Sequence, residues 1–368
     1  MNKKNNTIIR KWLRLSLTTA SAAILIIGMA SAQDVRDLKL RNYRPRSIYK
    51  IPVTIIEKAK YPAIDIHTHA CRNEQDVAAC VKAMDDCGVA KAVVFAGTGQ
   101  SFDNAMKLYS KYPGRFEFWC GFDYKGFGQP DYGPVAVKEL ERCVKAGARG
   151  VGELMFKGKG IAPGACDTIV MVPDDPRLAP LFRKCAELHL PVNLHVSEDK
   201  WMYEPIDSTN DGLMNAARWE IKITNRAKTH EEMLTRLENC VKKYPDVTFI
   251  AAHMANCCYD LDYLGRLFDK YPNLYADMSA RLGEMASAPR YTHNFFEKYQ
   301  NRIIYAADMN KYDPIIYKGN WRILETMDEH FYELHWNPYH WPLYGIYLSD
   351  TNLKKLYRDN ALKIMNHK

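Results

Sequence analysis

The sequence predicts an α/β fold, a (β/α)8 TIM barrel with an N-terminal extension and two long loops. Short apolar runs alternate with helical patterns, which is typical of repeated βα units around a parallel sheet. Eight such runs occur, the number that a closed barrel requires. The expected strands are residues 63–67, 92–95, 116–120, 150–154, 192–195, 248–253, 274–277 and 303–306. An open, doubly wound sheet is the competing fold, and periodicity alone does not exclude it.

The helical segments between the expected strands have recognisable ends. Thr229 and Glu232 have the spacing of a capping box before an apolar helical pattern. Gly88, Gly147 and Pro272 lie where helices are expected to end. These signals support the alternation of strands and helices that a barrel needs.

The first 32 residues are expected to be a signal peptide. Basic residues precede an apolar run at 20–30 and then Ala30-Ser31-Ala32, which predicts cleavage after Ala32 and export to the periplasm or the exterior. The alternative is an uncleaved membrane anchor, because the uncharged stretch 15–33 is nearly long enough to span a bilayer. Small and polar residues dilute this stretch, which favours cleavage and no stable membrane association afterwards.

The rest of the chain is expected to form an extension, residues 33–60, and one barrel domain, residues 61–368. The extension is basic and rich in proline, and we expect it to pack on the barrel. The leader holds five of the 51 basic residues and no acidic one, so 46 basic and 43 acidic residues remain, a net charge of +3. A charge this small does not indicate a nucleic-acid partner.

Two of the expected connections are longer than a barrel requires, residues 199–227 after the fifth strand and 309–348 after the eighth. Long loops in a compact domain are usually functional or disordered. Both contain many aromatic residues, which disfavours disorder. These are Trp201, Tyr203, Trp219, Trp321, Phe331, Tyr332, Trp336, Tyr339 and Trp341. We expect the two loops to form a packed wall or lid over a pocket.

The ten cysteines form no CxxC pair. Export favours disulfides in general. Half of these cysteines, however, lie in apolar helix or strand patterns, where a buried free thiol is the ordinary state. These are Cys80, Cys120, Cys143, Cys185 and Cys240. We therefore expect mostly unpaired thiols, and the sequence gives no connectivity.

The first candidate functional motif is His67-Thr68-His69, at the end of the first expected strand. Residues two apart on a strand point to the same side of a sheet, so both imidazoles would point into the barrel. That end of the strand belongs to the face where TIM-barrel active sites lie. The motif alone is weak evidence for a metal site. It becomes stronger because other strands also end in residues that can bind a metal ion.

Four further strands end in a side chain that can bind a metal ion. Glu153 ends the fourth strand, His195 the fifth and His253 the sixth, and Asp308 follows the eighth. For any one of them, a hydrogen-bonded core or rim residue is the more ordinary interpretation. For six residues together that interpretation is poor, because a barrel arranges its strand ends in one ring. The sequence therefore predicts a metal site formed by these six side chains.

This set of residues resembles the amidohydrolase superfamily, in which His-x-His follows strand one, histidines follow strands five and six, and an aspartate follows strand eight. Other segments resemble its amidohydrolase-related branch across residues 40–366. They are 44–47 (RPRS), 178–191 (LAPLFRKCAELHLP), 277–284 (DMSARLGE), 299–304 (YQNRII) and 357–361 (YRDNA). The resemblance implies a metal-dependent TIM-barrel enzyme, and it specifies the superfamily far better than the substrate.

The resemblance also implies roles for the five residues just matched. His67, His69 and Asp308 would bind the more buried ion, and His195 would be a further ligand or anchor a second ion. His253 would bind the second ion or, as in one-metal relatives, act as an acid that polarises the substrate.

The number of ions depends on the fourth strand. Many two-metal relatives bridge their ions there with a carboxylated lysine or a glutamate. Glu153 ends this strand and Lys157 lies past its expected end, which favours Glu153 as the ligand. One-metal relatives have no acid there, so one or two ions remain open. Ligands that are histidine and carboxylate without cysteine suit Zn, Mn, Co or Fe(II), with zinc as the default.

Such a site predicts hydrolysis independently of the family. A divalent cation lowers the pKa of bound water toward ~7, so hydroxide forms at neutral pH and attacks a carbonyl or phosphoryl centre. Asp308, in contact with metal and water, is expected to accept the proton and pass it to the leaving group. Asp308 and His253 are therefore the predicted catalytic residues.

Arg281 follows the seventh strand and is the predicted substrate-binding residue, because a guanidinium there can clamp a carboxylate or phosphate. The alternative is a structural ion pair with Asp277 or Glu284. Asp65 is expected to point away from the metal side, into core hydrogen bonds.

The remaining histidines are expected to have ordinary positions. His189 is expected at a helix end, and His230, His293 and His367 are expected to face solvent. The last loop contains His330, His335 and His340, for which contact with substrate is an open alternative.

Three functions are compatible with the sequence. The first is hydrolysis of an amide, lactone or ester bond in a small molecule, which export and Glu153 favour. The second is metal-dependent decarboxylation of an aromatic or unsaturated acid, known in the same branch of the superfamily. The third is an inactive barrel that binds a ligand, and an intact set of metal ligands argues against it. The oligomeric state is open, a homo-oligomer included.

Overall fold

The structure is a computed structural model that describes residues 35–158, 170–221 and 228–366. Packing divides the chain into two units, residues 1–45 and 46–368. The described part of the first unit contains two 3-10 turns, η1 (Val35–Asp37) and η2 (Leu40–Asn42). The expected signal peptide and its cleavage site after Ala32 lie outside the described residues.

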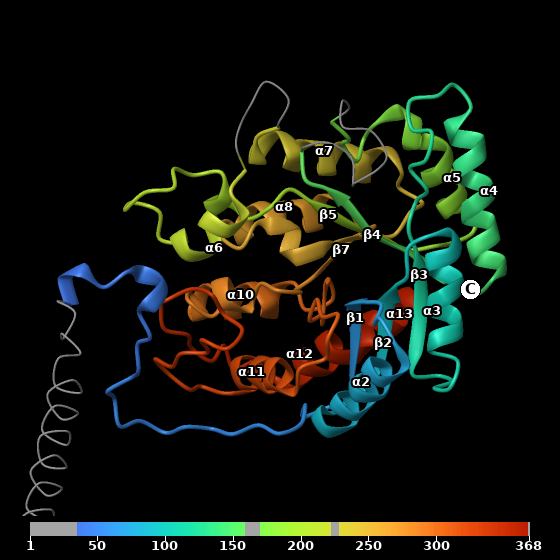
Figure 1. Cartoon of the computed structure of the whole chain (residues 1–368). Helices are drawn as coiled ribbons and strands as arrows, with labels where there is room; N and C mark the ends of the chain where they lie inside the picture. Colours follow the sequence, from blue (N-terminus) through green and yellow to red (C-terminus); the bar gives the residue numbers. More distant parts are fainter. Residues whose placement is uncertain (1–34, 159–169, 222–227, 367–368) are drawn as a thin grey trace, which may run out of the picture. The chain divides into compact units, whose positions relative to one another are not determined.

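Eight parallel strands form the predicted barrel in the second unit (Figure 1). Each strand pairs with its neighbours in chain order, and a bridge between Thr68 and Met309 joins the end of the last strand to the first. Ile66 N–H donates to Tyr305 O across the same seam, at 3.2 Å. The strands are β1 (Ala63–His69), β2 (Val89–Phe95), β3 (Phe116–Cys120), β4 (Gly150–Phe156), β5 (Val192–Val196), β6 (Phe249–Ala251), β7 (Leu274–Asp277) and β8 (Ile303–Ile304).

A longer helix follows each strand in the described part of the chain. These helices are α2 (Glu74–Cys87), α3 (Gly99–Leu108), α4 (Tyr132–Lys145), α5 (Ala179–Glu187), α7 (His230–Lys243), α8 (Leu261–Lys270), α10 (Pro289–Lys298) and α11 (Pro314–Glu325). Thr229 and Glu232 form the predicted capping box of α7, and Gly88 ends α2 in the left-handed conformation that glycine tolerates. Shorter elements are η3 (Pro176–Leu178), η4 (Lys200–Met202), α6 (Leu213–Trp219), η5 (Ala252–Asn256), α9 (Leu282–Met285), α12 (Asp350–Lys354), η6 (Lys355–Asp359) and α13 (Asn360–Met365).

The barrel interior is filled by apolar side chains of the strands. One buried cluster consists of Ile64, Ile66, Val93, Phe95, Trp119, Ile250, Tyr275, Ile304 and Ala306, joined by Ala361 and Met365 of α13. Asn360 at the start of α13 donates to the carbonyl of Ile303 at 2.8 Å, which fixes the helix against β8. Because Ala361 and Met365 lie in this cluster, the C-terminal helix is part of the barrel core. Burial of each large apolar side chain stabilises the folded chain by about 1.5–3 kcal/mol.

β6 and β8 end earlier than the sequence predicts, because the backbone leaves the extended conformation before the candidate ligands. β6 ends at Ala251, and His253 has a φ of 57°. β8 ends at Ile304, and Asp308 has a φ of 58°. Left-handed backbone costs residues other than glycine about 1–3 kcal/mol, and it is concentrated at functional sites. The strained positions therefore coincide with the predicted site.

The two long connections meet, as expected of a shared wall. Trp201, after β5, lies 6.2 Å from the Tyr339 ring, and Tyr339 stacks on Trp341 at 4.0 Å. The expectation was wrong for Trp321, because the connection after β8 begins with α11, and Trp321 on this helix is fully buried against Tyr317. Residues 222–227 of the connection after β5 lie outside the described residues.

The nine described cysteines are free thiols, in agreement with the expectation of mostly unpaired cysteine. Eight of them are buried, and Cys258 is partly exposed. Their burial follows from the apolar helix and strand patterns in which the sequence places them.

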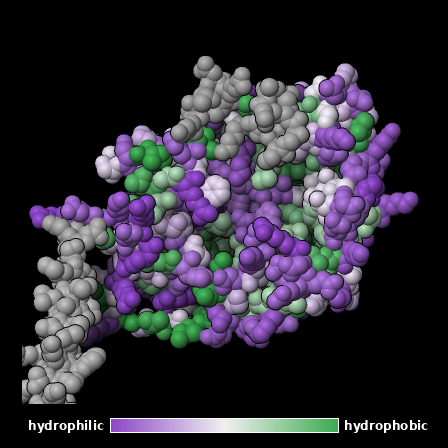
Figure 2. All heavy atoms as spheres, viewed as in Figure 1, coloured by the Kyte–Doolittle hydropathy of each residue, from purple (hydrophilic) through white to green (hydrophobic). Residues whose placement is uncertain are grey.

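The surface in view is mainly hydrophilic (Figure 2). Hydrophobic atoms also gather at its lower edge, where the extended segment 46–60 runs in Figure 1. In this segment Ile48, Val53 and Ile55 are 90%, 68% and 77% exposed, while Thr54 donates to Asp328 at 2.6 Å. None of the described helices combines the length and apolarity needed to cross a membrane.

His230 is buried at the start of α7, so the expectation that it faces solvent was wrong. Its Nε2 lies 3.1 Å from the carbonyl oxygen of Asn256, and the rings of Tyr203 and Tyr259 each lie 5.4 Å away. Burial lowers the pKa of His230 from 6.5 to about 4, because the charged imidazolium loses its hydration.

This burial predicts a pH dependence of stability. Between pH 6.5 and 4 the unfolded chain binds a proton at His230 that the folded chain excludes, so the free energy of unfolding falls as pH decreases through this range. The contribution lost between about pH 7 and pH 5 is about 2 kcal/mol. His230→Gln retains a donor for Asn256 but does not titrate. Urea unfolding should therefore show a smaller loss for the variant than for the wild type, and equal losses would contradict a buried, neutral His230.

Candidate metal centre and active site

The two histidines of the His-x-His motif end β1 and approach the same carboxylates, as their spacing predicts. His67 is fully buried and His69 is half-buried. The ring of Phe95, at the end of β2, lies 4.7 Å from the His67 ring and 5.9 Å from the His69 ring. This apolar ring keeps water from one side of the motif.

His67 is held so that one nitrogen points into the site. Its Nδ1 lies 3.1 Å from the Asp277 carboxylate and 3.2 Å from Ser279 Oγ. Asp277 is fully buried and also accepts from Asn193 at 2.7 Å, so its position is fixed. The other nitrogen, His67 Nε2, is buried and has no hydrogen-bond partner within the protein. A buried polar atom without a partner is costly unless something binds it.

His253 is oriented in the same way from the left-handed turn after β6. Its Nδ1 lies 2.9 Å from the carbonyl oxygen of Ser279. A carbonyl only accepts, so Nδ1 carries the proton and the neutral ring presents an unprotonated Nε2. This Nε2 points to Glu153, at 3.2 Å, and to His195 Nδ1, at 3.1 Å.

Glu153 lies at the centre of the histidines. Its Oε1 contacts His195 Nδ1 and His253 Nε2, and its Oε2 lies 3.8 Å from His67 Nε2 and 3.7 Å from His69 Nε2. The Glu153 side chain is only 6% exposed. One carboxylate thus lies near imidazoles from the ends of β1 and β5 and from the turn after β6.

Asp308 completes the group from the turn after β8. Its backbone N–H donates to His67 O at 2.9 Å, which fixes the turn against β1. Its carboxylate oxygen lies 3.0 Å from His69 Nε2 and 3.6 Å from His67 Nε2. The structure therefore brings together all six predicted ligands.

His195 connects this group to a further acid. Its Nε2 lies 3.5 Å from the carboxylate of Glu198, and Glu198 forms an ion pair with Lys157. Lys157 lies just past the end of β4, as the sequence predicts, and its ammonium group is committed to Glu198. Glu198 therefore faces His195 from the side opposite Glu153, at a distance longer than a hydrogen bond.

The charges in the site shift several pKa values. Burial alone would raise the pKa of the carboxyl groups, but the histidines outweigh burial, so the pKa of Asp277 falls to about 2 and that of Glu153 falls well below its usual range. Burial lowers the pKa of His67, yet the charges of Asp277 and Glu153 raise it well above its usual value. The buried carboxylates therefore favour positive charge at this position, either a proton or a divalent metal ion.

The geometry fits a metal site. The ligand atoms of His67, His69 and Asp308 lie within 4.8 Å of one another, and so do those of His67, Glu153 and His253. Ligand atoms about 2.0–2.2 Å from one zinc ion lie within about 4.4 Å of each other, so small shifts suffice. His67 has one free nitrogen and serves one ion only. A second ion would therefore rely on Glu153, His195 and His253.

The position of Glu153 leads to a test of the number of ions. If Glu153 bridges two ions, Glu153→Ala should lower the metal content of the purified protein from two equivalents to about one, because Glu153 lies near both groups of candidate ligands. Elemental analysis of the folded variant and the wild type measures this. A wild-type content of one equivalent would contradict a bridging role for Glu153.

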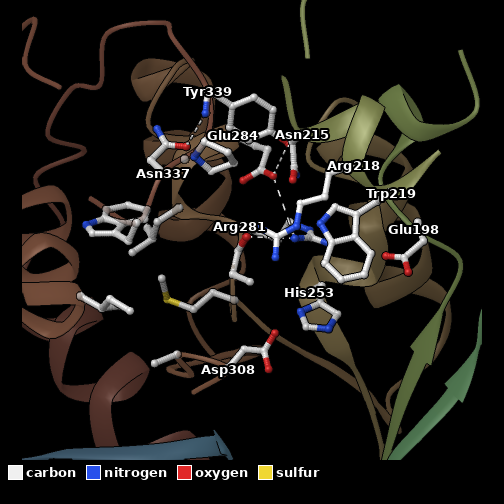
Figure 3. Close-up of a pocket in the computed structure, with 18 of the residues that line it drawn as sticks. Glu198, Asn215, Arg218, Trp219, His253, Arg281, Glu284, Asp308, Asn337 and Tyr339 are labelled. Carbon is white, nitrogen blue, oxygen red and sulfur yellow. Dashed lines mark hydrogen bonds and ion pairs between the residues drawn. The ribbon is translucent and has the colours of Figure 1, made fainter. Parts of the chain in front are cut away.

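A cavity of about 500 Å³ opens beside His253 and Asp308 (Figure 3). This size is typical of sites for small molecules. Trp219 lines it from the connection after β5, and Trp336 and Tyr339 line it from the connection after β8. The predicted aromatic wall is therefore present, and it faces the candidate metal centre.

Arg281 lines this cavity but is already paired. Its Nε lies 3.0 Å from the Asp199 carboxylate, and its Nη2 donates to Asn256 Oδ1 at 2.5 Å. Glu284 is farther away, at 4.0 Å, and accepts from Tyr339 at 2.8 Å. This arrangement favours the structural role of Arg281, with Asp199 as the partner in place of Asp277. Its role as a clamp for substrate remains a prediction.

Other predicted residues have mixed outcomes. Asp65 is buried and accepts from Tyr317 at 3.0 Å, as expected of a core residue. His335 lines the cavity, whereas His330 pairs with Ser47 at 3.2 Å. His189 is exposed at the end of α5, as expected, and His293 is half-buried against the carbonyl of Ile346. His367 lies outside the described residues.

Sequence patterns did not single out three polar residues that surround the candidate ligands, Asp277, Ser279 and Glu198. Asp277 and Ser279 hold His67 and His253, and Glu198 faces His195. A signal for the first pair was present, because Asp277 ends the seventh expected strand and Ser279 follows two residues later. Glu198 follows β5 in the same way, three residues after His195.

The fold and the site agree with comparisons to known proteins. The sequence-family model described as Amidohydrolase matches residues 64–366. A search of curated proteins found none that matches the chain.

Solved structures with the same fold include three barrels of low sequence identity. A 2,6-dihydroxybenzoate decarboxylase is 15% identical, with 83% of this chain and 98% of that chain covered and a TM-score of 0.53. An uncharacterized TIM-barrel protein from Bordetella bronchiseptica is 13% identical, with coverages of 83% and 98% and a TM-score of 0.52. A 5-carboxyvanillate decarboxylase from Novosphingobium aromaticivorans, solved with manganese, is 16% identical, with coverages of 85% and 99% and a TM-score of 0.50. At these identities the likeness shows a shared fold.

Proposed function

The chain belongs to the amidohydrolase family, and we propose that it is a metal-dependent hydrolase that uses water to cleave an amide, lactone or ester bond in a small molecule. The observation that carries the proposal is His67 Nε2, a buried nitrogen without a partner that faces the carboxylates of Glu153 and Asp308. Zinc is the expected ion, and Mn, Co or Fe would fit the same histidine and carboxylate ligands.

The reaction requires a metal ion that activates water and a side chain that transfers the proton. A bound divalent cation supplies Lewis acidity, which lowers the pKa of water and polarises the bond to be cleaved. His69 and the fixed charges of the site hold the pKa of Asp308 below its usual range, so Asp308 is a carboxylate at neutral pH and can accept a proton at Oδ. Asp308 lines the cavity, so it can pass the proton to the leaving group.

His253 is better suited to bind a metal ion than to act as a charged acid. Burial, together with the charge of His195, lowers the pKa of His253, so its ring is neutral at pH 7. With the proton on Nδ1, its Nε2 is available to bind a metal ion. This supports a ligand role for His253 and leaves proton transfer to Asp308.

The cavity favours a flat, polar substrate. Trp219, Trp336 and Tyr339 offer ring surfaces, and Asn215, Asn337 and Glu284 offer polar atoms between them. Two of the cations that line the cavity, Lys157 and Arg281, are paired with Glu198 and Asp199. A substrate ring can therefore pack on the aromatic wall while its reacting bond faces Asp308.

Decarboxylation of an aromatic acid is the second candidate, because the aromatic wall would also accept such a ring. Two of the structurally similar barrels act on aromatic acids according to their names. The reactions differ in what is consumed and released, so they can be separated directly. A screen of metal-loaded protein against lactones, amides, esters and aryl acids would follow proton release and carbon dioxide. Carbon dioxide from an aryl acid, with no hydrolysis in the screen, would contradict the proposed hydrolase.

Export remains part of the proposal, with cleavage after Ala32 giving a periplasmic or secreted enzyme. Sequencing the N-terminus of the protein recovered from an expressing cell tests this. A mature chain that begins at Gln33 supports export, and an intact leader in a membrane fraction contradicts it.

A further inference from the structure

The end of β1 places two cysteines side by side next to the candidate metal centre. Cys71 lies in the turn after His69, and Cys80 lies on α2. Their sulfur atoms are 3.0 Å apart. A disulfide bond is about 2.05 Å long, so a shift of about 1 Å would join the two sulfurs.

The surroundings aim the Cys71 side chain at Cys80. The backbone N–H of Cys71 donates to the Tyr109 hydroxyl at 2.8 Å, which holds the turn against α3 and the following segment. The Cys71 sulfur also lies 3.8 Å from the carbonyl oxygen of Asn310. Cys71 is 7% exposed and Cys80 is 1% exposed, so a reagent in solvent meets Cys71 first.

We propose that Cys71 and Cys80 are a modification site, a dithiol that forms a reversible disulfide with a low-molecular-weight disulfide as oxidant. The Cys71 thiolate attacks one sulfur of the oxidant, forms a mixed disulfide and releases one thiol. The Cys80 sulfur then attacks the Cys71 sulfur, forms the Sγ–Sγ bond and releases the second thiol. The two cysteines lose two electrons and two protons, and the oxidant gains them as its S–S bond is reduced.

A disulfide between Cys71 and Cys80 would affect the candidate metal centre, because Cys71 lies close to His69. Cys71 is two residues from His69, and His69 Nε2 lies 3.0 Å from the Asp308 carboxylate. A disulfide would fasten the turn that follows His69 to α2, a helix of the barrel. The oxidised protein should therefore release a bound metal ion more slowly than the reduced protein.

The cross-link can be read directly, because Arg72 separates the two cysteines in sequence. Wild-type protein is incubated with oxidised glutathione, denatured in an alkylating reagent and digested with trypsin. Cleavage after Lys60, Arg72 and Lys82 gives peptides 61–72 and 73–82. We expect mass spectrometry to find them joined as the main species, and to find them separate after reduction.

Matched variants control the assay. Cys80→Ala should lose the joined species and leave Cys71 as the mixed disulfide with glutathione, because no second thiol resolves it. Cys240→Ala removes another fully buried thiol, one for which the described residues provide no sulfur contact, and should keep the joined species. Alkylation of both Cys71 and Cys80 in oxidised wild type, or pairing of Cys71 with another cysteine, would overturn the proposal.

A second measurement, the rate of metal release, rests on the proposed function, whereas the cross-link assay needs no metal. We expect transfer of the ion to a chelator to be several-fold slower from oxidised than from reduced wild type, and equal from the two forms of Cys80→Ala. Equal rates for a fully cross-linked wild type would overturn the anchoring of His69. A protein that binds no metal at all would contradict the proposed function and leave the cross-link result standing.

Discussion

Asp308→Asn is expected to keep its metal and to lower kcat by about 100-fold or more, the usual effect of losing a positioned acid or base. The amide retains an oxygen that can face the ion but cannot accept the proton at neutral pH. The substrate contacts of the ground state are unchanged, so KM should change little while kcat and kcat/KM fall together. Steady-state kinetics beside elemental analysis measures both parts.

Asp313→Asn is the matched control. Asp313 lies five residues further along, caps α11 through the N–H of Ile315, and approaches His335 at 2.8 Å. Asparagine caps a helix about as well as aspartate, so this variant should retain the wild-type kcat. If Asp308→Asn turned over substrate at the wild-type rate, Asp308 would be at most a structural ligand, and the base would have to be Glu153 or His253.

His67→Ala is expected to lose the metal and the activity while the barrel stays folded, and His69→Ala to do the same. Changes to residues that merely orient a ligand already lower metal affinity about 10- to 100-fold, so loss of the ligand should cost at least as much. Circular dichroism checks the fold, and dialysis followed by elemental analysis measures the metal.

His335→Ala is the control for this pair, because it removes an imidazole that lines the same cavity without contacting Glu153 or Asp308 in the described structure. It should retain the full metal content. Full occupancy in His67→Ala would remove His67 from the site and with it the observation on which the proposed function rests.

The sequence predicted the barrel and the six candidate ligands because both follow from local patterns. An apolar run that stops at a polar residue marks a strand end, and a closed barrel places all such ends in one ring. The precise ends of β6 and β8 could not be predicted, because His253 and Asp308 adopt left-handed φ values that tertiary contacts impose. The helix α11 was missed as a separate element inside an aromatic-rich stretch, which left Trp321 in the wrong place.

The remaining errors concern pairs of residues that are distant in sequence. Arg281 pairs with Asp199, which lies on the connection after β5 and which local spacing could not indicate, in addition to the more distant Glu284 that the sequence offered. His230 is buried because Asn256 and Tyr259, from the turn after β6, pack on it. No periodicity reports such contacts, because they depend on which loops meet above the barrel.

Anomalous diffraction from crystals of the protein as purified would test the metal centre most directly. We expect a peak at the absorption edge of the bound metal, about 2.0–2.2 Å from Nε2 of His67, Nε2 of His69 and an oxygen of Asp308. A second peak near Glu153, His195 and His253 would establish two ions. Full activity in protein stripped of metal, with no anomalous peak among these side chains, would contradict the account.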